Sequence, residues 1–516
     1  MESILVSFVF GIFKKLNAWY EHSFTHKIMK WIFSLFEASI ICKFIAKERN
    51  YWGSGLIKYL NFSFLKPIFI FLNKLLETSF LFKISASVGN YAKIVLLGST
   101  PFKIFLWFLN THTSHVKMLF LTLSFFVIFM TITPSHLWSN LFIIAFGAFI
   151  FAIFTFQVFT NKIKFEREFI PPSLILFMFF ATFSIVTSFN TMDSIRVFSI
   201  MLASILISIV TSYSLNSVAR VRLFIGFIFV SLLLTAAYGI VQFMGGIEIR
   251  LDFIDLEANP DMAGRLFSTM GNPNNYAKFI TMFLPFVISL FFVVKGTFRK
   301  LILLGGIGLI VIVLLFTLSR ASYLVLLGSL GVFVLILKPR LVPIAIALAL
   351  LSMPFWPDFI MARLSTLGTD SSSIFRMWIW EGSLRMLGSY FITGVGIGPL
   401  AFRTIYLEYS HQLAGSAMHS HNVFLQVWLE IGIGGFLALI AYNFIAIKKG
   451  IISFFRTNNF ELKLYLAAAI SSVCAFLAFA MVEHVWFYPR TMLVYFITMG
   501  ITFSLIRLAK KEFVNG

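Results

Sequence analysis

Two arginines and one histidine are the residues of this sequence best suited to chemistry on an anionic group. Arg265 precedes a Gly271-Asn-Pro-Asn274 turn, Arg376 lies in a predicted helix, and His421 follows His419 by two positions. The planar guanidinium of arginine binds phosphate oxygens through two hydrogen bonds and keeps its charge when partly buried. A histidine can accept the proton of a hydroxyl near neutral pH. These residue types favour group transfer at a phosphate-activated centre.

Neighbouring motifs admit structural interpretations as well as functional ones. The segment Gly394-Val-Gly-Ile-Gly398 has the glycine spacing of a dinucleotide-binding fingerprint, but no strand precedes it, so we expect tight turns. His419 and His421 lack a third acidic or cysteine partner nearby, so we expect no metal site. Trp378 and Trp380 suit either an aromatic anchor at a membrane interface or a platform for a sugar ring.

The composition indicates the class of protein that positions these residues. Of 516 residues, 59% are hydrophobic, 12% are charged and 66 are phenylalanines, and the mean hydropathy is +0.92. A water-soluble domain cannot bury that much apolar surface, which excludes soluble enzymes, disordered chains and disulfide scaffolds. Cys42 and Cys474 lie far apart in apolar stretches, so a cysteine-rich zinc site is not expected. We predict an all-α polytopic membrane protein.

Long apolar blocks separated by short polar joints begin at residue 117. A helix needs roughly 20 apolar residues to cross a membrane, and the blocks predict about twelve such helices. The ninth block is the shortest. The predicted spans are 117–133, 139–159, 169–189, 195–214, 221–243, 275–294, 300–317, 321–337, 341–354, 420–445, 462–480 and 488–507.

The formal charge of +20 fits cytoplasmic loops and lipid headgroups better than nucleic acid. If the N-terminus is cytoplasmic, every inside joint is basic, and the first two outside joints contain neither lysine nor arginine. We therefore expect both termini in the cytoplasm. The inside cations are Lys162, Lys164, Arg167, Arg220, Arg222, Lys295, Arg299, Lys300, Lys338, Arg340, Lys448, Lys449, Arg456, Lys463, Arg507, Lys510 and Lys511.

Two predicted outside connections are long enough to hold a site, namely 245–274 and, between the ninth and tenth spans, 355–419. A polar segment at a membrane boundary must satisfy its backbone groups against protein or water, so we expect the first loop to line a cavity. In the second loop, serines precede a predicted helix with Arg376, Trp380 and Leu384 on one face. Some outside arginines will only brace loops. They are Arg250, Arg265, Arg320, Arg363, Arg376, Arg385, Arg403 and Arg490.

Residues 1–116 differ from the transmembrane domain predicted at 117–516. Lysines interrupt their short apolar runs, and none of these runs reaches the length of a span. We expect amphipathic helices on the cytoplasmic membrane surface. Their role, in binding lipid, a cytoplasmic partner or one another, stays open.

An ordered set of motifs resembles the O-antigen ligase and O-antigen polymerase superfamily of membrane glycosyltransferases. The similarity covers about 245–435, and it rests on the order of the motifs because no single one is specific. Ala321 stands where the family pattern has glycine. The motifs are Arg265 before Gly271-Asn-Pro-Asn274, Ser319-Arg320, Ser372-x-x-x-Arg376-x-x-x-Trp380, Gly394-x-Gly-x-Gly398, and His419-Ser-His-Asn422 with Leu425, Glu430 and Gly432.

The resemblance implies transfer of a glycan from an undecaprenyl pyrophosphate carrier to an acceptor sugar hydroxyl, outside a bacterial cytoplasmic membrane. Arg265 and Arg376 would hold the pyrophosphate, and His421 would be the essential loop histidine. An anomeric carbon on pyrophosphate already has a good leaving group, so only a cationic clamp and a base are needed. We expect inverting transfer without metal or cofactor. The candidates for substrate binding are Arg320, Arg363, Asn272, Asn274, Trp380, Asn422 and Glu430.

Several functions remain open within and beyond this class. The first is a surface-polysaccharide polymerase, and an O-antigen ligase or a protein O-oligosaccharyltransferase would use the same site. A transporter of lipid-linked sugars is the alternative from another class, although the polar residues gather outside rather than at the midplane. The expected partners are the lipid-linked donor, a glycan acceptor, membrane lipid and polysaccharide-assembly proteins. The enzyme hypothesis requires Arg265, Arg376 and His421 to converge.

Overall fold

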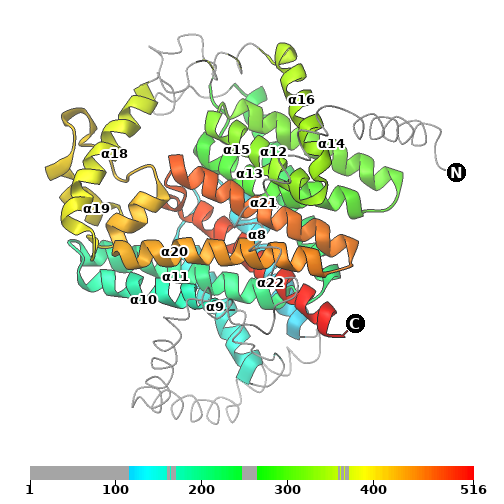
Figure 1. Ribbon diagram of the computed structural model, residues 1–516, viewed down its shortest axis with the longest axis horizontal. Helices are drawn as coiled ribbons and strands as arrows, with labels where there is room; N and C mark the ends of the chain where they lie inside the picture. Colours follow the sequence, from blue (N-terminus) through cyan, green and yellow to red (C-terminus); the bar gives the residue numbers. More distant parts are fainter. Residues whose placement is uncertain are drawn as a thin grey trace, which may run out of the picture. The chain divides into compact units, whose positions relative to one another are not determined.

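The computed structural model describes residues 115–159, 163, 170–246, 264–357, 361, 365 and 371–515, and no strand occurs in these ranges (Figure 1). The chain from Thr113 to Gly516 is one compact unit. The predicted surface helices of the N-terminal region lie outside the described residues, except for its last two positions. Arg250 and Arg363 also lie outside them.

Each of the twelve predicted spans corresponds to a helix, which confirms the all-α polytopic prediction. Nine helices in the described ranges are long and apolar enough to cross a membrane, and α8, α10 and α16 provide shorter apolar stretches. The helices are α8 His115–Ile132, α9 Leu141–Phe159, α10 Pro172–Val186, α11 Thr191–Ser214, α12 Val218–Met244, α13 Pro273–Val293, α14 Thr297–Phe316, α15 Arg320–Leu337, α16 Val342–Ser352, α20 Val423–Arg456, α21 Phe460–Val482 and α22 Pro489–Asn515.

Helices α13, α21 and α22 form the buried centre of the bundle (Figure 1). Helix α21 packs against α13, α15, α20 and α22, while α11 packs against α22 and α9. The consecutive small residues Ala467, Ala468 and Ala469 are fully buried on α21 and allow close approach of its neighbours. Outer helices expose apolar side chains such as Phe149 and Leu301, as expected for a surface in contact with lipid.

A glycine-dependent turn positions the end of the long outer loop. Helix α20 is interrupted at Gly432, where φ is 81° and ψ is 179°. The segment from Gly394 to Gly398 lies against this interruption, and the Gly396 amide donates to the Glu430 carbonyl at 3.1 Å. All three glycines of the segment have positive φ, and a Cβ on Gly394 would lie 2.5 Å from the Glu430 carbonyl. The turn interpretation is therefore confirmed, because only glycine fits this backbone.

The predicted outside connections gather at one end of the bundle. Arg490, at the start of α22, donates to the Thr133 carbonyl after α8 at 2.8 Å. It also donates to the Thr269 carbonyl at 3.2 Å, in the 3-10 helix η4 Ser268–Met270. Arg490 is thus a brace between loops. Arg222 of α12 pairs with Glu461 of α21, and both residues belong to joints predicted inside. Contacts thus join outside connections to one another and inside connections to one another, as antiparallel spans require.

Candidate functional site

Three cationic or titratable side chains converge on the carboxylate of Glu483. Arg376 Nη2 lies 2.5 Å from Glu483 Oε1, and Lys278 Nζ lies 3.4 Å from Oε2. His421 Nδ1 lies 3.7 Å from the same Oε2. Glu483 directly follows α21, Lys278 lies in α13, His421 precedes α20, and Arg376 lies in α18, which spans Ser371–Tyr390. The cluster therefore joins four distant segments of the chain.

Burial is graded across this cluster. Side-chain exposure is 2% for Lys278 and 10% for Glu483, but 23% for Arg376 and 26% for His421. Burial alone would raise the pKa of the Glu483 carboxyl, but Lys278, Arg376 and His421 outweigh this effect and hold the pKa well below its usual value. Glu483 is therefore ionised at neutral pH. Lys278 and Arg376 both face this carboxylate, and Arg376 and His421 are the partly exposed members of the cluster.

His421 has an uncommon backbone conformation that its neighbours enforce. Its φ is 50°, in the left-handed region, which costs a residue with a Cβ roughly 1–2 kcal/mol. The preceding Ser420 amide donates to Gln426 Oε1 at 2.6 Å, and the Ser420 carbonyl accepts from Trp380 Nε1 at 2.9 Å. On the other side, the Asn422 side chain caps α20. Such over-determined strain is typical of functional sites.

Glu430 supports the His421 loop from inside the protein. Its Oε1 accepts from Gln426 Nε2 at 2.9 Å and from the Gly398 amide at 3.1 Å. Gln426 in turn holds the Ser420 amide next to His421. Glu430 is buried, so in this structure it positions the loop through Gln426 and the glycine turn.

Arg265 lies in the segment before the 3-10 helix η4 and contacts the first turn of α13 and the end of α14. Its Nη2 donates to Asn274 Oδ1 at 2.7 Å, and its Nε donates to the Thr317 carbonyl at 3.0 Å. Asn274 and Lys278 are four residues apart on α13 and hence on one helix face. Arg376 and His421 thus meet at Glu483, whereas Arg265 is linked to α13 through Asn274.

Several other predicted residues lie at the starts of helices. Asn272 caps α13 by accepting from the Asn274 and Asn275 amides. Arg320 is buried at the first position of α15. The predicted helix around Arg376 is present, but Leu384 is 59% exposed and does not share the buried face.

Two further histidines lie behind His421. The ring of His419 is 4.1 Å from that of His421 and 5.4 Å from that of His484. Burial lowers the pKa of His419 well below its usual value, and charge on His421 and His484 lowers it further. Burial also lowers the pKa of His484, to about 3. Both rings are therefore neutral at pH 7, and across the described ranges no group of three potential ligands is arranged to hold a metal.

Sequence reasoning missed two members of the cluster. Neither Glu483 nor Lys278 was among the candidate residues for the site, and Lys278 falls within the span predicted at 275–294. Ionisable side chains at the edge of apolar blocks are costly, and this is the signal that could have found both. Trp378, considered above as a sugar platform, instead stacks on His411 at 4.6 Å between ring centroids.

The arrangement can bind an anion and accept a proton. Glu483 faces Nδ1 of His421, so the imidazole presents Nε2 on its other side. A neutral imidazole with Nδ1–H directed at a carboxylate has Nε2 available as a base. Arg376 lies on the opposite oxygen of the same carboxylate and has further guanidinium donors for phosphate oxygens.

Residues 305–440 match a protein family described as O-antigen ligase. The match begins within α14, ends within α20, and includes Arg376 and His421. It confirms the resemblance to the O-antigen ligase and polymerase superfamily, and it supports a membrane glycosyltransferase of that type. No curated protein matches the chain.

Proposed function

We propose that this protein transfers a glycan from undecaprenyl pyrophosphate to an acceptor sugar hydroxyl, and that it acts as a surface-polysaccharide polymerase. The site would face the outside of a bacterial cytoplasmic membrane, with both termini in the cytoplasm. The observation that supports this proposal most strongly is the convergence of Arg376, Lys278 and His421 on Glu483. It combines a cationic surface for pyrophosphate with a base for a hydroxyl.

The proposed reaction needs one proton acceptor and charge stabilisation on the leaving group. His421 Nε2 takes the proton of the acceptor hydroxyl as its oxygen bonds to the anomeric carbon. The bond from that carbon to the phosphate oxygen breaks, and undecaprenyl pyrophosphate leaves with the electron pair. Arg376, with Lys278 behind it and Arg265 nearby, stabilises the charge that develops on this oxygen. In-line attack inverts the anomeric configuration.

Glu483 has two roles in this scheme. Its Oε2 lies 3.7 Å from Nδ1 of His421, so in the reaction it would orient the imidazole and stabilise the ring once it has taken the proton of the hydroxyl. In the absence of donor, Glu483 also compensates the charges of Lys278 and Arg376. The incoming pyrophosphate would therefore compete with Glu483 for the guanidinium of Arg376. The other predicted substrate-binding residues, Arg320, Arg363, Asn272, Asn274, Trp380, Asn422 and Glu430, remain candidates.

The family match gives a reason for a second candidate within the same class. The matched family is described as O-antigen ligase, and a ligase would deliver the glycan to a separate acceptor rather than to a second lipid-linked repeat. The chemistry at His421 would be unchanged, and only the acceptor would differ.

The test is transfer by purified protein with lipid-pyrophosphate-linked repeats in the presence of EDTA. Native protein is expected to produce longer lipid-linked glycans, whereas His421→Ala is expected to produce none. The matched control is His136→Ala, because His136 is an exposed histidine in another loop at the same end of the bundle. It should retain native activity.

Three results would contradict parts of the proposal. Native activity in His421→Ala would remove His421 as the base. Products formed only when a separate glycan acceptor is supplied would replace the polymerase with the ligase. Movement of lipid-linked repeats across proteoliposomes without any new glycosidic bond would replace the enzyme with a transporter.

A further inference from the structure

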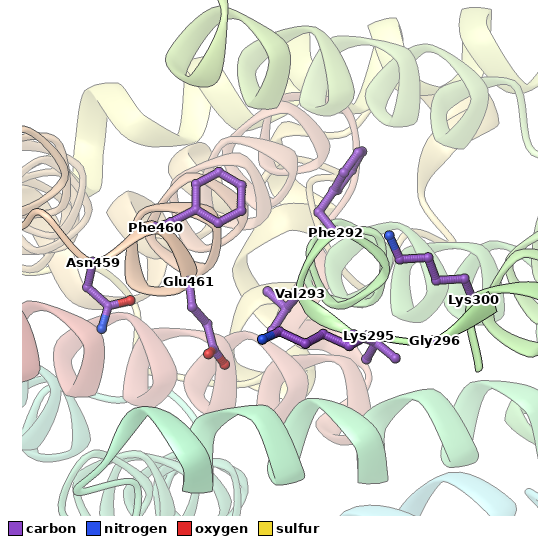
Figure 2. A pocket seen from close by; sticks show the side chains of 9 residues that line it. Phe292, Val293, Lys295, Gly296, Lys300, Asn459, Phe460 and Glu461 are labelled. Carbon is purple, nitrogen blue, oxygen red and sulfur yellow. The ribbon is translucent and has the colours of Figure 1, made fainter. Parts of the chain in front are cut away.

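A cavity of about 600 Å³ lies at the end of the bundle opposite the Glu483 cluster. It is formed between the turn that joins α13 to α14 and the start of α21. Figure 2 shows the two sides facing each other. Lys278 lies near the start of α13 and Lys295 lies just after its end. At the rise of an α-helix these two residues are about 25 Å apart, which is close to the hydrocarbon thickness of a bilayer. The lining residues are Phe292, Val293, Val294, Lys295, Gly296, Lys300, Asn459, Phe460 and Glu461.

The cavity is positively charged despite its single carboxylate. Arg222 Nε donates to Glu461 Oε1 at 2.6 Å, and the Tyr465 hydroxyl donates to the same oxygen at 2.9 Å. The charge of Glu461 is therefore compensated outside the cavity. Within the described residues, neither Lys295 nor Lys300 forms an ion pair with a carboxylate. Both lysines can thus bind an anion.

The walls of the cavity also fit the chains of a lipid. Phe292 is 51% exposed and Phe460 is 66% exposed, on opposite sides of the opening. Phe298, in the first turn of α14, is also exposed. Exposed aromatic side chains next to lysines at the end of membrane spans are typical of the interface between headgroups and acyl chains. A soluble anion would not use this apolar rim.

We propose that this cavity binds the phosphate headgroup of an anionic phospholipid, with Lys295 and Lys300 on the phosphate and Phe292 and Phe460 against the acyl chains. Basic pockets between transmembrane helices suit such headgroups because the lysines act on a surface that is already rich in negative charge. Helices α13 and α21 both extend from this cavity to the Glu483 cluster. The site does not depend on the proposed glycosyl transfer.

The test is native mass spectrometry of the full chain released from zwitterionic detergent. The probes are phosphatidylglycerol and phosphatidylcholine with identical acyl chains, and inorganic phosphate as competitor. Native protein is expected to bind phosphatidylglycerol more tightly than phosphatidylcholine. The double variant Lys295→Gln/Lys300→Gln is expected to lose about thirtyfold in affinity for phosphatidylglycerol, since each lysine contributes about 1 kcal/mol at a membrane surface.

Two matched variants make the result specific. Lys338→Gln/Lys511→Gln removes two exposed lysines among the basic joints and should retain native binding. Lys295→Arg/Lys300→Arg keeps both charges and should also bind. Equal losses in the two glutamine variants, or no loss in Lys295→Gln/Lys300→Gln, would overturn the site. Displacement of phosphatidylglycerol by an equal concentration of inorganic phosphate would show a free phosphate site and overturn the lipid assignment.

Discussion

Replacing Glu483 with glutamine removes the carboxylate that the Lys278 ammonium contacts. The attraction across their 3.4 Å separation is about 5 kcal/mol at an effective dielectric constant of about 20. Losing one partner of a buried pair typically costs about 3–5 kcal/mol, because the other charge stays buried without compensation. Lys278 is only 2% exposed, so solvent cannot replace the carboxylate. We expect Glu483→Gln to lower the free energy of unfolding by about 3–5 kcal/mol.

The assay is unfolding in mixed micelles by titration with sodium dodecyl sulfate, followed by circular dichroism. Glu461→Gln is the matched control, since Glu461 also pairs with an arginine but at a site where the Arg222 side chain is 46% exposed. Its loss should stay below about 1 kcal/mol. The double variant Glu483→Gln/Lys278→Met should recover at least about 2 kcal/mol, because it leaves no buried lysine charge. Equal stability of Glu483→Gln and native protein, or no recovery in the double variant, would refute the reasoning.

Two other predictions concern the neighbouring histidines. His421→Gly should be more stable than His421→Ala by about 1 kcal/mol in the same unfolding assay, because φ is 50° at this position; the reverse order would argue against backbone strain. Burial holds the pKa of His484 at about 3, below its unfolded value of about 6.5, so protons bind the unfolded state first as pH falls. His484 should therefore lower the free energy of unfolding by about 1.4 kcal/mol for each pH unit that the pH falls between these values. The free energy of unfolding, measured from pH 7 to pH 4, should depend less on pH in His484→Gln than in the native protein. The same pH dependence of the free energy of unfolding in the variant and the native protein would contradict this assignment.

The helices could be predicted from the sequence because hydropathy is a local property. The ninth block is short in the sequence, and α16 spans only Val342–Ser352. The glycine turn from Gly394 to Gly398 was equally local, since its spacing without a preceding strand already favoured turns. In each case the information lies within a window of some twenty residues or fewer.

The centre of the site could not be predicted in the same way. Glu483 is 107 residues from Arg376 and 205 residues from Lys278 in the chain. Nothing near Glu483 in the sequence specifies which of the outer loops it meets, because packing of α13, α18 and α21 decides that. Leu384 gives the converse case. Its spacing of four residues from Trp380 predicts a shared helix face, but periodicity does not show how far along that face the helix is covered by the rest of the protein.

Buried arginines and exposed lysines serve different physical purposes at the two ends of the bundle. At the site end, Arg265 and Arg490 are buried and donate to backbone carbonyls of neighbouring loops. A guanidinium can satisfy several such acceptors in a plane and still keep its charge, whereas a buried ammonium needs a carboxylate such as Glu483. At the opposite end, exposed lysines such as Lys295 act as mobile charges at a surface. The predominance of arginine in the predicted outer loops therefore reflects loop bracing in part, and Arg376 is distinguished from the braces by its carboxylate partner and partial exposure.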